Sequence, residues 1–313
     1  MAPTTEPLIR AEKLSKHFGA FVAVDGIDFT VARGEAFGFL GPNGAGKSST
    51  MRMIGCVSPV SAGMLRIFDL DPGADGTRIR GRLGVVPQQD SLDEELTVFE
   101  NLVVYGRYFD LPRSLCRERA RELLDFVQLR DRADSRVEPL SGGMKRRLTI
   151  ARSLMSEPEM LLLDEPTTGL DPQARHLVWD RLYRLKQRGV TLVLTTHYMD
   201  EAEQLCDRLV IMDNGRIVAE GSPRELIERY ITREVLELRF AEADEADEAD
   251  AAAVSDLVER VEALPDRLLL YSDDGEQTLE QVHERKVRPL SALVRRATLE
   301  DVFLRLTGRS LVE

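Results

Sequence analysis

The chain has 313 residues, of which 43% are hydrophobic and 31% charged, a composition typical of a globular protein. Its 42 basic and 54 acidic residues give a net charge of −12, which argues against a nucleic-acid partner held through phosphates. Nowhere do about 18 apolar residues follow one another, so the sequence predicts no transmembrane helix. The N-terminus lacks the apolar segment of a secretory signal. We therefore expect another chain to supply any membrane-spanning part.

Residues 8–40 are predicted to form strands. Apolar and polar residues alternate over 27–31, and the short apolar run 36–40 leads into a glycine-rich loop. Two later apolar runs, 160–163 and 190–194, are typical of parallel strands that are buried on both faces. Helical spacing of apolar residues separates these runs, and the alternation indicates an α/β fold.

The pattern changes near residue 210. Asn214-Gly215 lies between two short apolar segments and predicts a type I′ hairpin. Ser222-Pro-Arg-Glu225 combines an N-cap, a proline and a capping box, which predicts that a helix begins there.

Beyond this helix the sequence is typical of a small α+β unit. The acidic tract 241–250 is interpreted as a solvated linker or insertion. Strands are expected over 236–240 and 267–271, and helices over 254–264 and 299–306.

The segment Gly41–Ser48 fits the pattern G-x-x-x-x-G-K-[ST] between a predicted strand and a predicted helix. Glycines allow backbone N–H groups to approach phosphate oxygens closely, and the helix start adds positive potential. Lys47 is suited to the β- and γ-phosphates of ATP, and the Ser48 hydroxyl to Mg²⁺. The sequence therefore predicts a nucleotide-binding loop.

Asp164 and Glu165 follow the apolar run 160–163, at the end of a strand where open α/β sheets bind ligands. Asp164 is suited to Mg²⁺, and Glu165 is the candidate general base for the attacking water. The alternative interpretation is a pair of acids that caps the next helix.

Two further segments are candidates for phosphate binding. Ser141 can cap a basic amphipathic helix, and Gly142 and Gly143 expose N–H groups there, which predicts a second phosphate-binding helix start. His197 follows the strand 190–194 and is suited to hydrogen-bond the γ-phosphate. A lone histidine in that place is otherwise a structural residue.

In these residues, over about residues 8–230, the chain resembles ATP-binding cassette (ABC) ATPases. The resemblance implies that Phe18 stacks on adenine, that Gln88 senses Mg²⁺ and water, and that Asp171 belongs to the D-loop. Phe18 stands where tyrosine is common, and Met144 where glutamine is usual. The implied catalytic residues are Glu165, His197 and Gln88; those near Mg²⁺ are Ser48, Gln88 and Asp164. The implied nucleotide-contacting residues are Phe18, Gly41, Pro42, Asn43, Gly44, Ala45, Gly46, Lys47, Ser48, Ser49, Ser141, Gly142, Gly143 and Asp171.

The resemblance also implies the fold: an α/β P-loop NTPase with a RecA-like core, an antiparallel β subdomain and a helical subdomain. We expect this ATP-binding domain to span 8–232, with the helical subdomain at about 89–156. A small α+β domain is expected over 233–313. The tract 241–250 within it is not a recognised feature of the family.

Four segments, 84–92, 101–109, 171–179 and 299–308, look like the Nod factor export ATP-binding protein I family of the ABC-2, drug-exporter type. This implies an ATP-hydrolysing subunit that powers a separate integral membrane permease from the cytoplasmic face of the inner membrane. In that family the cargo is lipo-chitooligosaccharide. ATP sandwiched between two cassettes implies a second ATP-binding subunit, most simply in a homodimer, although a heterodimer stays open.

Other functions remain as alternatives: a drug or polysaccharide exporter, an importer, or a soluble ABC ATPase acting on ribosomes or chromosomes. The apolar side chains of Leu96, Phe99, Tyr105 and Tyr108 are expected to form a groove for the permease. The alternative for each is packing inside the helical region.

Overall fold

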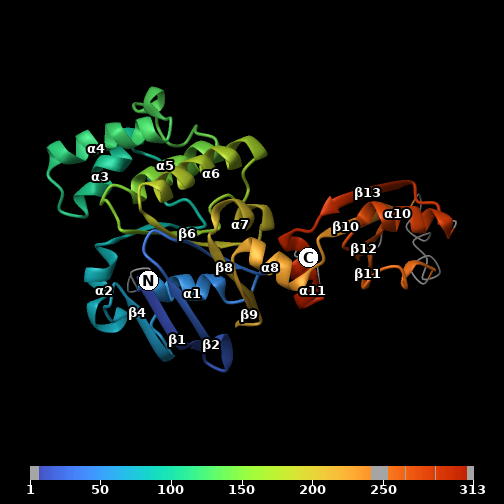
Figure 1. The fold of residues 1–313 in the computed structure, drawn as a ribbon. Helices are drawn as coiled ribbons and strands as arrows, with labels where there is room; N and C mark the ends of the chain where they lie inside the picture. Colours follow the sequence, from blue (N-terminus) through green and yellow to red (C-terminus); the bar gives the residue numbers. More distant parts are fainter. Residues whose placement is uncertain (1–6, 241–252, 265, 286, 309–313) are drawn as a thin grey trace, which may run out of the picture. The chain divides into compact units, whose positions relative to one another are not determined.

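The computed structural model describes residues 7–240, 253–264, 266–285 and 287–308, so the predicted acidic tract 241–250 lies outside the described residues. The chain divides into two compact units, residues 1–220 and 221–313 (Figure 1). The expected domain boundary after residue 232 stays a prediction.

The first unit begins with a three-stranded antiparallel sheet. Its strands are β1 (Ile9–Phe18), β2 (Phe21–Val31) and β4 (Ala62–Ile67), in the order β2-β1-β4. Ile9 pairs with Val31 on one side and with Ile67 on the other. All three side chains are buried, so this sheet contributes one face to the core of the unit.

A six-stranded sheet forms the centre of the first unit. Its strands run in the order β5-β6-β7-β3-β8-β9, and the pairs from β5 to β8 are parallel. The backbone of Asn214 and Gly215 has φ values of +48° and +78°, so the predicted type I′ turn joins β8 to β9. The strands are β3 (Ala36–Leu40), β5 (Leu83–Val86), β6 (Met160–Asp164), β7 (Thr191–Thr196), β8 (Arg208–Asp213) and β9 (Arg216–Gly221).

Helix α1 (Lys47–Ile54) lies between the two sheets and packs against β2, β6 and β7 (Figure 1). The other helices of this unit are α2 (Pro72–Arg80), α3 (Val98–Arg107), α4 (Arg113–Phe126), the 3₁₀ turn η1 (Arg130–Arg132), α5 (Gly142–Ser153), α6 (Pro172–Gln187) and α7 (Met199–Leu205). No helix in the described part of the chain is both long and apolar enough to span a bilayer.

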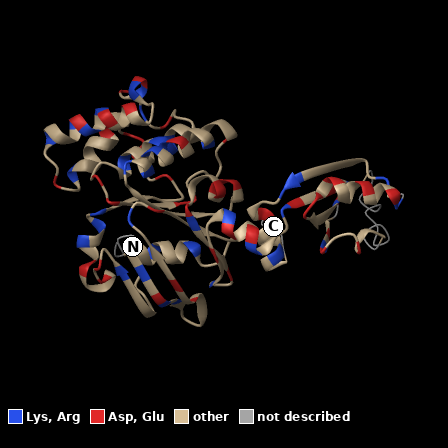
Figure 2. Cartoon of the chain, in the orientation of Figure 1, with Lys and Arg blue, Asp and Glu red and all other residues tan. Residues whose placement is uncertain are grey.

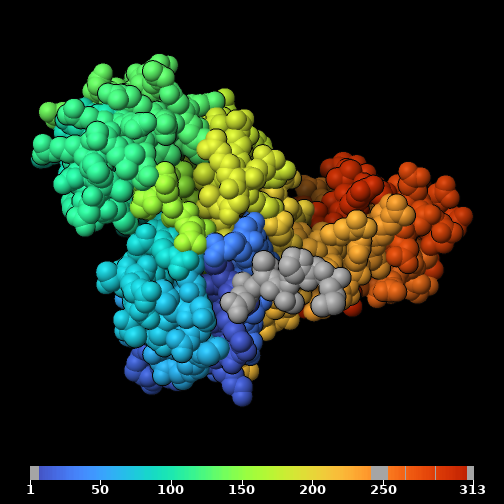
Figure 3. Space-filling model, turned by 60° about the vertical axis from the view of Figure 1, so that its left-hand side comes forward, coloured from blue at the N-terminus to red at the C-terminus, as the bar shows by residue number. Residues whose placement is uncertain are grey.

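The helices α3 and α4 and one face of α5 enclose an apolar core of their own, which includes Leu102, Leu124 and Leu148. In the space-filling view the green residues of α3 and α4 form a lobe distinct from the blue strands β1 and β2 (Figure 3). Basic residues, drawn in blue, follow one another along α5 (Figure 2). This helix therefore combines apolar residues that pack into the lobe with a run of basic residues.

The second unit begins at the predicted capping box. Oγ of Ser222 accepts a hydrogen bond from the N–H of Glu225 at 3.2 Å, and the Glu225 carboxylate accepts one from the N–H of Ser222 at 2.8 Å. Helix α8 (Pro223–Tyr230) follows, and it packs against α11 (Leu299–Thr307) at the end of the chain.

A four-stranded antiparallel sheet with the order β11-β12-β10-β13 forms the rest of this unit, together with α10 (Gly275–Glu284). The prediction of a helix over 254–264 was wrong beyond its first residue, because residues 255–259 form turns and bends and Arg260–Leu264 pairs with β12 as a strand. The apolar residues of this segment fit both the spacing of a helix and the alternation of a strand, and pairing with β12 selects the strand. The strands are β10 (Glu234–Arg239), β11 (Arg260–Leu264), β12 (Arg267–Ser272) and β13 (Ser291–Arg296).

Candidate active site

The phosphate loop connects β3 to α1, as the sequence predicts. A Cβ atom on Gly41 would lie 2.3 Å from the carbonyl oxygen of Met212, and one on Gly46 would lie 2.5 Å from that of Ala23. Gly46 also has φ of +100°, a conformation that L side chains rarely adopt. Both positions therefore require glycine for reasons of space, and Gly46 also for its backbone.

Lys47 is buried at the start of α1. Its Nζ donates hydrogen bonds to the carbonyl oxygens of Gly41 at 2.6 Å and Pro42 at 2.9 Å. Burial lowers the pKa of Lys47, while the negative charges of Glu165 and Asp164 oppose that shift. These two carbonyl oxygens thus hold the ammonium group over the loop, where phosphate oxygens of a bound nucleotide can replace them as its hydrogen-bond acceptors.

A hollow of about 210 Å³ lies over this loop. It joins side chains from the loop, from the β1–β2 hairpin and from the ends of β5 and β6. Its lining residues are Phe21, Ala23, Asn43, Gly44, Gly46, Lys47, Ser48, Ser49, Gln88 and Glu165. The structure therefore brings Gln88 and Glu165 together with the phosphate loop, as the resemblance implied.

Asp164 ends β6 in register with Thr195 of β7. Its Oδ1 accepts hydrogen bonds from Oγ1 of Thr195 at 2.6 Å and from Oγ of Ser48 at 3.3 Å. A serine hydroxyl beside a carboxylate fits Mg²⁺, which takes few protein oxygens and completes its shell with phosphates and water. These two residues, with the amide of Gln88 nearby in the hollow, are suited to hold that ion.

Glu165 is 7% exposed and adopts φ of +46°, an uncommon conformation for a non-glycine residue. Its Oε2 accepts hydrogen bonds from Nε2 of Gln88 at 2.9 Å and Oγ1 of Thr168 at 3.1 Å. Nδ1 of His197 lies 3.3 Å from its Oε1, without the alignment of a hydrogen bond. His197, then Thr168 and Lys47, hold the pKa of Glu165 below its ordinary value against the effect of burial. The carboxylate is therefore ionised at neutral pH.

The residues Ser141, Gly142, Gly143 and Asp171 do not line this hollow. They lie at the starts of two neighbouring helices. Ser141 caps α5 by accepting a hydrogen bond from the N–H of Met144 at 3.3 Å, and Asp171 caps α6 through the N–H of Ala174 at 2.8 Å. A Cβ on Gly143 would lie 2.7 Å from that of Ala174, so the glycine allows the helix starts to approach closely.

The predicted aromatic residue Phe18 is also absent from the lining. It ends β1 and pairs across the hairpin with Phe21, which starts β2. Nζ of Lys16 lies 4.9 Å from the centre of the Phe18 ring. Phe21 lines the hollow and is 63% exposed. Sequence reasoning missed Phe21, although its place opposite Phe18 across a short turn was the available signal.

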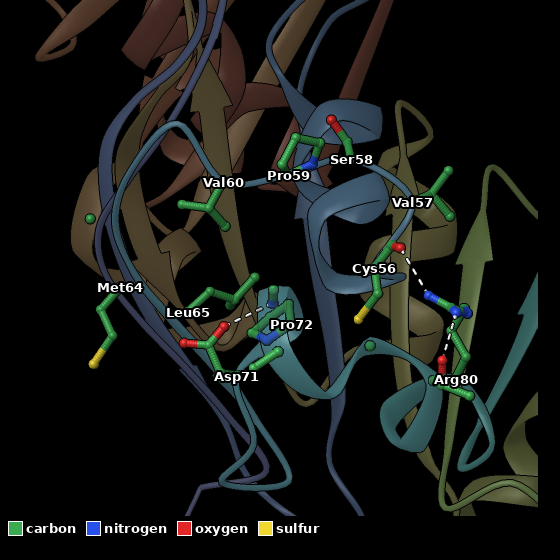
Figure 4. A pocket seen from close by; sticks show the side chains of 15 residues that line it. Cys56, Val57, Ser58, Pro59, Val60, Met64, Leu65, Asp71, Pro72 and Arg80 are labelled. Atoms are coloured by element: carbon green, nitrogen blue, oxygen red, sulfur yellow. Dashed lines mark hydrogen bonds between the residues drawn. The ribbon is translucent and has the colours of Figure 1, made fainter.

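A larger hollow, of about 650 Å³, lies between the end of α1, β4 and α2 (Figure 4). None of the predicted site residues lines it. Its two charged residues have partners: Arg80 donates a hydrogen bond to the carbonyl of Cys56 at 3.3 Å, and Asp71 caps α2 through the N–H of Gly73 at 2.8 Å. The chemistry predicted from the sequence belongs to the smaller hollow.

Two family models match the chain. The model described as ABC transporter matches residues 24–168, and the C-terminal domain of nodulation factor export protein NodI matches residues 245–308. The Nod factor export ATP-binding protein I of Ralstonia nicotianae is 48% identical over 309 residues, which cover 97% of this chain and 95% of the relative. The chain belongs to the Nod factor export ATP-binding protein I family.

Solved structures of ABC cassettes resemble this chain. An ATP-binding cassette, MJ1267 in its ADP conformation, is 28% identical with a TM-score of 0.66, covering 72% of this chain and 95% of its own. The dimeric post-hydrolysis cassette MJ0796, bound to ADP and phosphate, is 27% identical with a TM-score of 0.63, covering 68% and 98%. Both are ABC cassettes, so the P-loop NTPase fold expected from the sequence is confirmed. As a member of the Nod factor export ATP-binding protein I family, this chain is the ATPase subunit of an exporter.

Proposed function

We propose that this subunit hydrolyses ATP in the hollow over its phosphate loop and drives export of a lipo-chitooligosaccharide through a separate integral membrane permease. The observation that carries the proposal is the convergence of Gln88 and His197 on the Glu165 carboxylate beside Lys47. The cargo rests on the names of the relatives, which are Nod factor export proteins.

In this proposal the loop 41–49 holds the phosphates of ATP, with Lys47 on the β- and γ-phosphates. Ser48, Asp164 and Gln88 hold Mg²⁺, which when bound neutralises charge that develops on the phosphate oxygens. The adenine stacks on the aromatic pair Phe18 and Phe21 at the open end of the hollow.

Glu165 orients the attacking water and accepts its proton as the oxygen bonds to the γ-phosphorus and the bond to ADP breaks. His197 donates a hydrogen bond to the γ-phosphate, and Gln88 aligns the water. Phosphoryl transfer depends more on positioning than on base strength. A carboxylate with a lowered pKa is therefore suited to the role, because it stays ionised.

Ser141, Gly142, Gly143 and Asp171 act on the ATP bound to a second cassette. Two observations support this: these residues lie outside the hollow of their own chain, and MJ0796 is dimeric. Because this chain has both sets of residues, we propose a homodimer with two ATP sites.

The permease contacts the helical region on the cytoplasmic face of the inner membrane. Tyr108 is 77% exposed at the end of α3, and Leu96, Phe99 and Tyr105 are half-buried. Phe99 and Tyr105 pack partly against the core of the helical lobe, so Tyr108 is the side chain most available to a partner.

Purification of the complex from native membranes, followed by mass spectrometry, tests the proposal. A stoichiometric multi-span membrane protein is expected. Inverted vesicles that contain both proteins should then take up labelled lipo-chitooligosaccharide when ATP is supplied. Uptake of a drug or a polysaccharide in its place would correct the cargo, and ribosomal or chromosomal partners alone would reject the exporter.

A further inference from the structure

Arg146 is a buried arginine on α5, 4% exposed, and its guanidinium bonds only weakly to a carboxylate. Nε donates a hydrogen bond to the carbonyl oxygen of Pro166 at 2.7 Å. Nη2 donates to the carbonyl oxygens of Asp164 and Glu165, each at 3.0 Å. Nη1 donates to that of Pro87. One side chain thus bonds to four backbone carbonyls.

These carbonyls belong to two loops that both carry proposed catalytic residues. Pro87 precedes Gln88, and the run 164–166 contains Glu165. The guanidinium therefore joins the backbone of the two residues whose side chains bond to one another at 2.9 Å. The first of these loops is also fastened to α5 at a second point, because Asp90 accepts a hydrogen bond from Oγ1 of Thr149 at 3.1 Å.

The guanidinium of Arg146 is placed by its hydrogen bonds to the backbone carbonyls and not by a close ion pair with a carboxylate. The nearest carboxylate oxygen paired with it, Oδ1 of Asp90, lies 4.0 Å away. A buried guanidinium needs several acceptors for its five N–H donors, and the loop carbonyls supply four. Loss of the guanidinium would leave those buried carbonyls without these partners.

We propose that Arg146 is a positioning residue for ATP hydrolysis: its planar guanidinium sets the loop of Gln88 against the loop of Glu165, so that the carboxylate meets the attacking water in line. This inference rests on the functions proposed above for Gln88 and Glu165. It also gives a physical reason for the left-handed backbone of Glu165, since the carbonyl of that residue is held by Arg146.

The neighbouring residue Arg147 provides a matched control. It lies on the same helix, and its guanidinium donates to the carbonyl oxygens of Val127 at 2.7 Å and Gln128 at 3.4 Å. Those carbonyls carry no proposed site residue. Replacement of either arginine removes a charge from α5, but only Arg146 bonds to the loops of Gln88 and Glu165.

The experiment compares Arg146→Gln, Arg146→Lys, Arg147→Gln and Glu165→Gln in the full-length protein. Steady-state ATP hydrolysis gives kcat and KM, titration with a fluorescent ATP analogue gives affinity, and thermal melting checks the fold. We expect Arg146→Gln to lower kcat by about 30-fold or more, because a displacement of about 1 Å costs about 100-fold. KM and affinity should stay within about threefold, since Lys47 and its loop are untouched.

Arg146→Lys should lose about tenfold in kcat, because an ammonium is a point charge that cannot reach both loops as a planar fork does. Arg147→Gln should stay within about twofold of the unaltered protein. The proposal is overturned if Arg146→Gln keeps kcat within about twofold, or if kcat falls only as far as affinity does. If Arg146→Gln does not fold, the same criteria apply to Arg146→Lys. If Glu165→Gln is inactive and the Arg146 variants are active, the positioning role of Arg146 is rejected and the proposed base stands. If Glu165→Gln is active, the proposed base and the role of Arg146 are rejected together.

Discussion

Nε2 of Gln88 donates a hydrogen bond of 2.9 Å to Oε2 of Glu165 across 77 positions of sequence. The reason lies in the sheet: Val86 of β5 is in register with Leu163 of β6, and each of the two functional residues stands two positions further on. Parallel strands end at the same edge, so the two side chains meet there. The bond connects Gln88, the residue proposed to sense Mg²⁺ and align the water, with Glu165, the proposed base.

Glu165→Gln should abolish turnover while ATP binding persists. The amide keeps the size of the carboxylate but cannot accept the proton of the attacking water, and loss of a general base costs about 100- to 10,000-fold. We expect the variant to retain ATP and to accumulate as a dimer. Phosphate release and size-exclusion chromatography with ATP measure both effects. Near-normal hydrolysis would falsify the assignment of the base.

Phe21→Ala and Phe18→Ala should each weaken ATP binding. One aromatic stack contributes about 0.5–1.5 kcal/mol, which corresponds to about two- to twelvefold in affinity. We expect the larger loss for Phe21→Ala, because Phe21 lines the hollow and Phe18 does not. Inorganic triphosphate, which has no base to stack, is the control ligand. If both ligands lose affinity equally, the hairpin acts on the loop and not on adenine.

Glu159 should make the stability of the fold depend on acid. Hydrogen bonds from Arg82 at 2.6 Å and Arg33 at 2.7 Å lower its pKa to about 2. Because the folded pKa lies below the ordinary value, the contribution to stability is present above about pH 4.5 and is lost as the pH falls toward about 2. The carboxylate is partly exposed, so the contribution is about 0.5–1 kcal/mol.

Urea unfolding of Glu159→Gln and of the unaltered protein, from pH 7 downward, measures this dependence. The gap between the two should be largest near neutral pH and should narrow below pH 4.5. Glu228→Gln removes an exposed ion pair with Arg224 and serves as the control, which should show little difference. A gap for Glu159→Gln that is independent of pH would contradict the ion-pair explanation.

Tyr108→Glu should prevent permease binding and leave basal ATP hydrolysis unchanged. The side chain is largely exposed, so a charge there costs the fold little but opposes an apolar contact. Tyr183→Glu, on α6, is the matched control, because Tyr183 is also exposed and lies outside the proposed permease surface. Co-purification with the permease measures binding. A complex that forms normally with Tyr108→Glu would remove Tyr108 from that surface.

Local signals predicted much of the fold. The apolar runs 36–40 and 160–163 lie within β3 and β6, and all but the first residue of the run 190–194 lies in β7, because a strand buried on both faces needs no polar alternation. The turn at Asn214-Gly215 and the capping box at Ser222 depend on neighbouring residues, so they too were predictable. The strand at 260–264 was not, because its partner β12 decides between two periods that the apolar residues equally satisfy.

The candidate site also has residues that local sequence predicted and residues that it did not. The phosphate loop and the pair Asp164–Glu165 are contiguous in sequence, and their motifs predicted where they lie. Phe21 and Arg146 escaped prediction, because their environment depends on segments that approach only in the folded chain. A second arginine follows Arg146 directly, and nothing in the helical spacing says which of the two faces the loops of Gln88 and Glu165.

The chain has three cysteines, which differ in how far they are buried. Cys116 and Cys206 are buried, whereas Cys56 is half-buried just beyond the end of α1, the helix that begins with Lys47. Burial raises the pKa of the Cys56 thiol, so its alkylation needs a buffer alkaline enough to form the thiolate. The natural sequence thus offers one addressable thiol for a fluorophore. A dye attached there would report in real time on the helix that carries the phosphate loop, without any cysteine having to be added or removed.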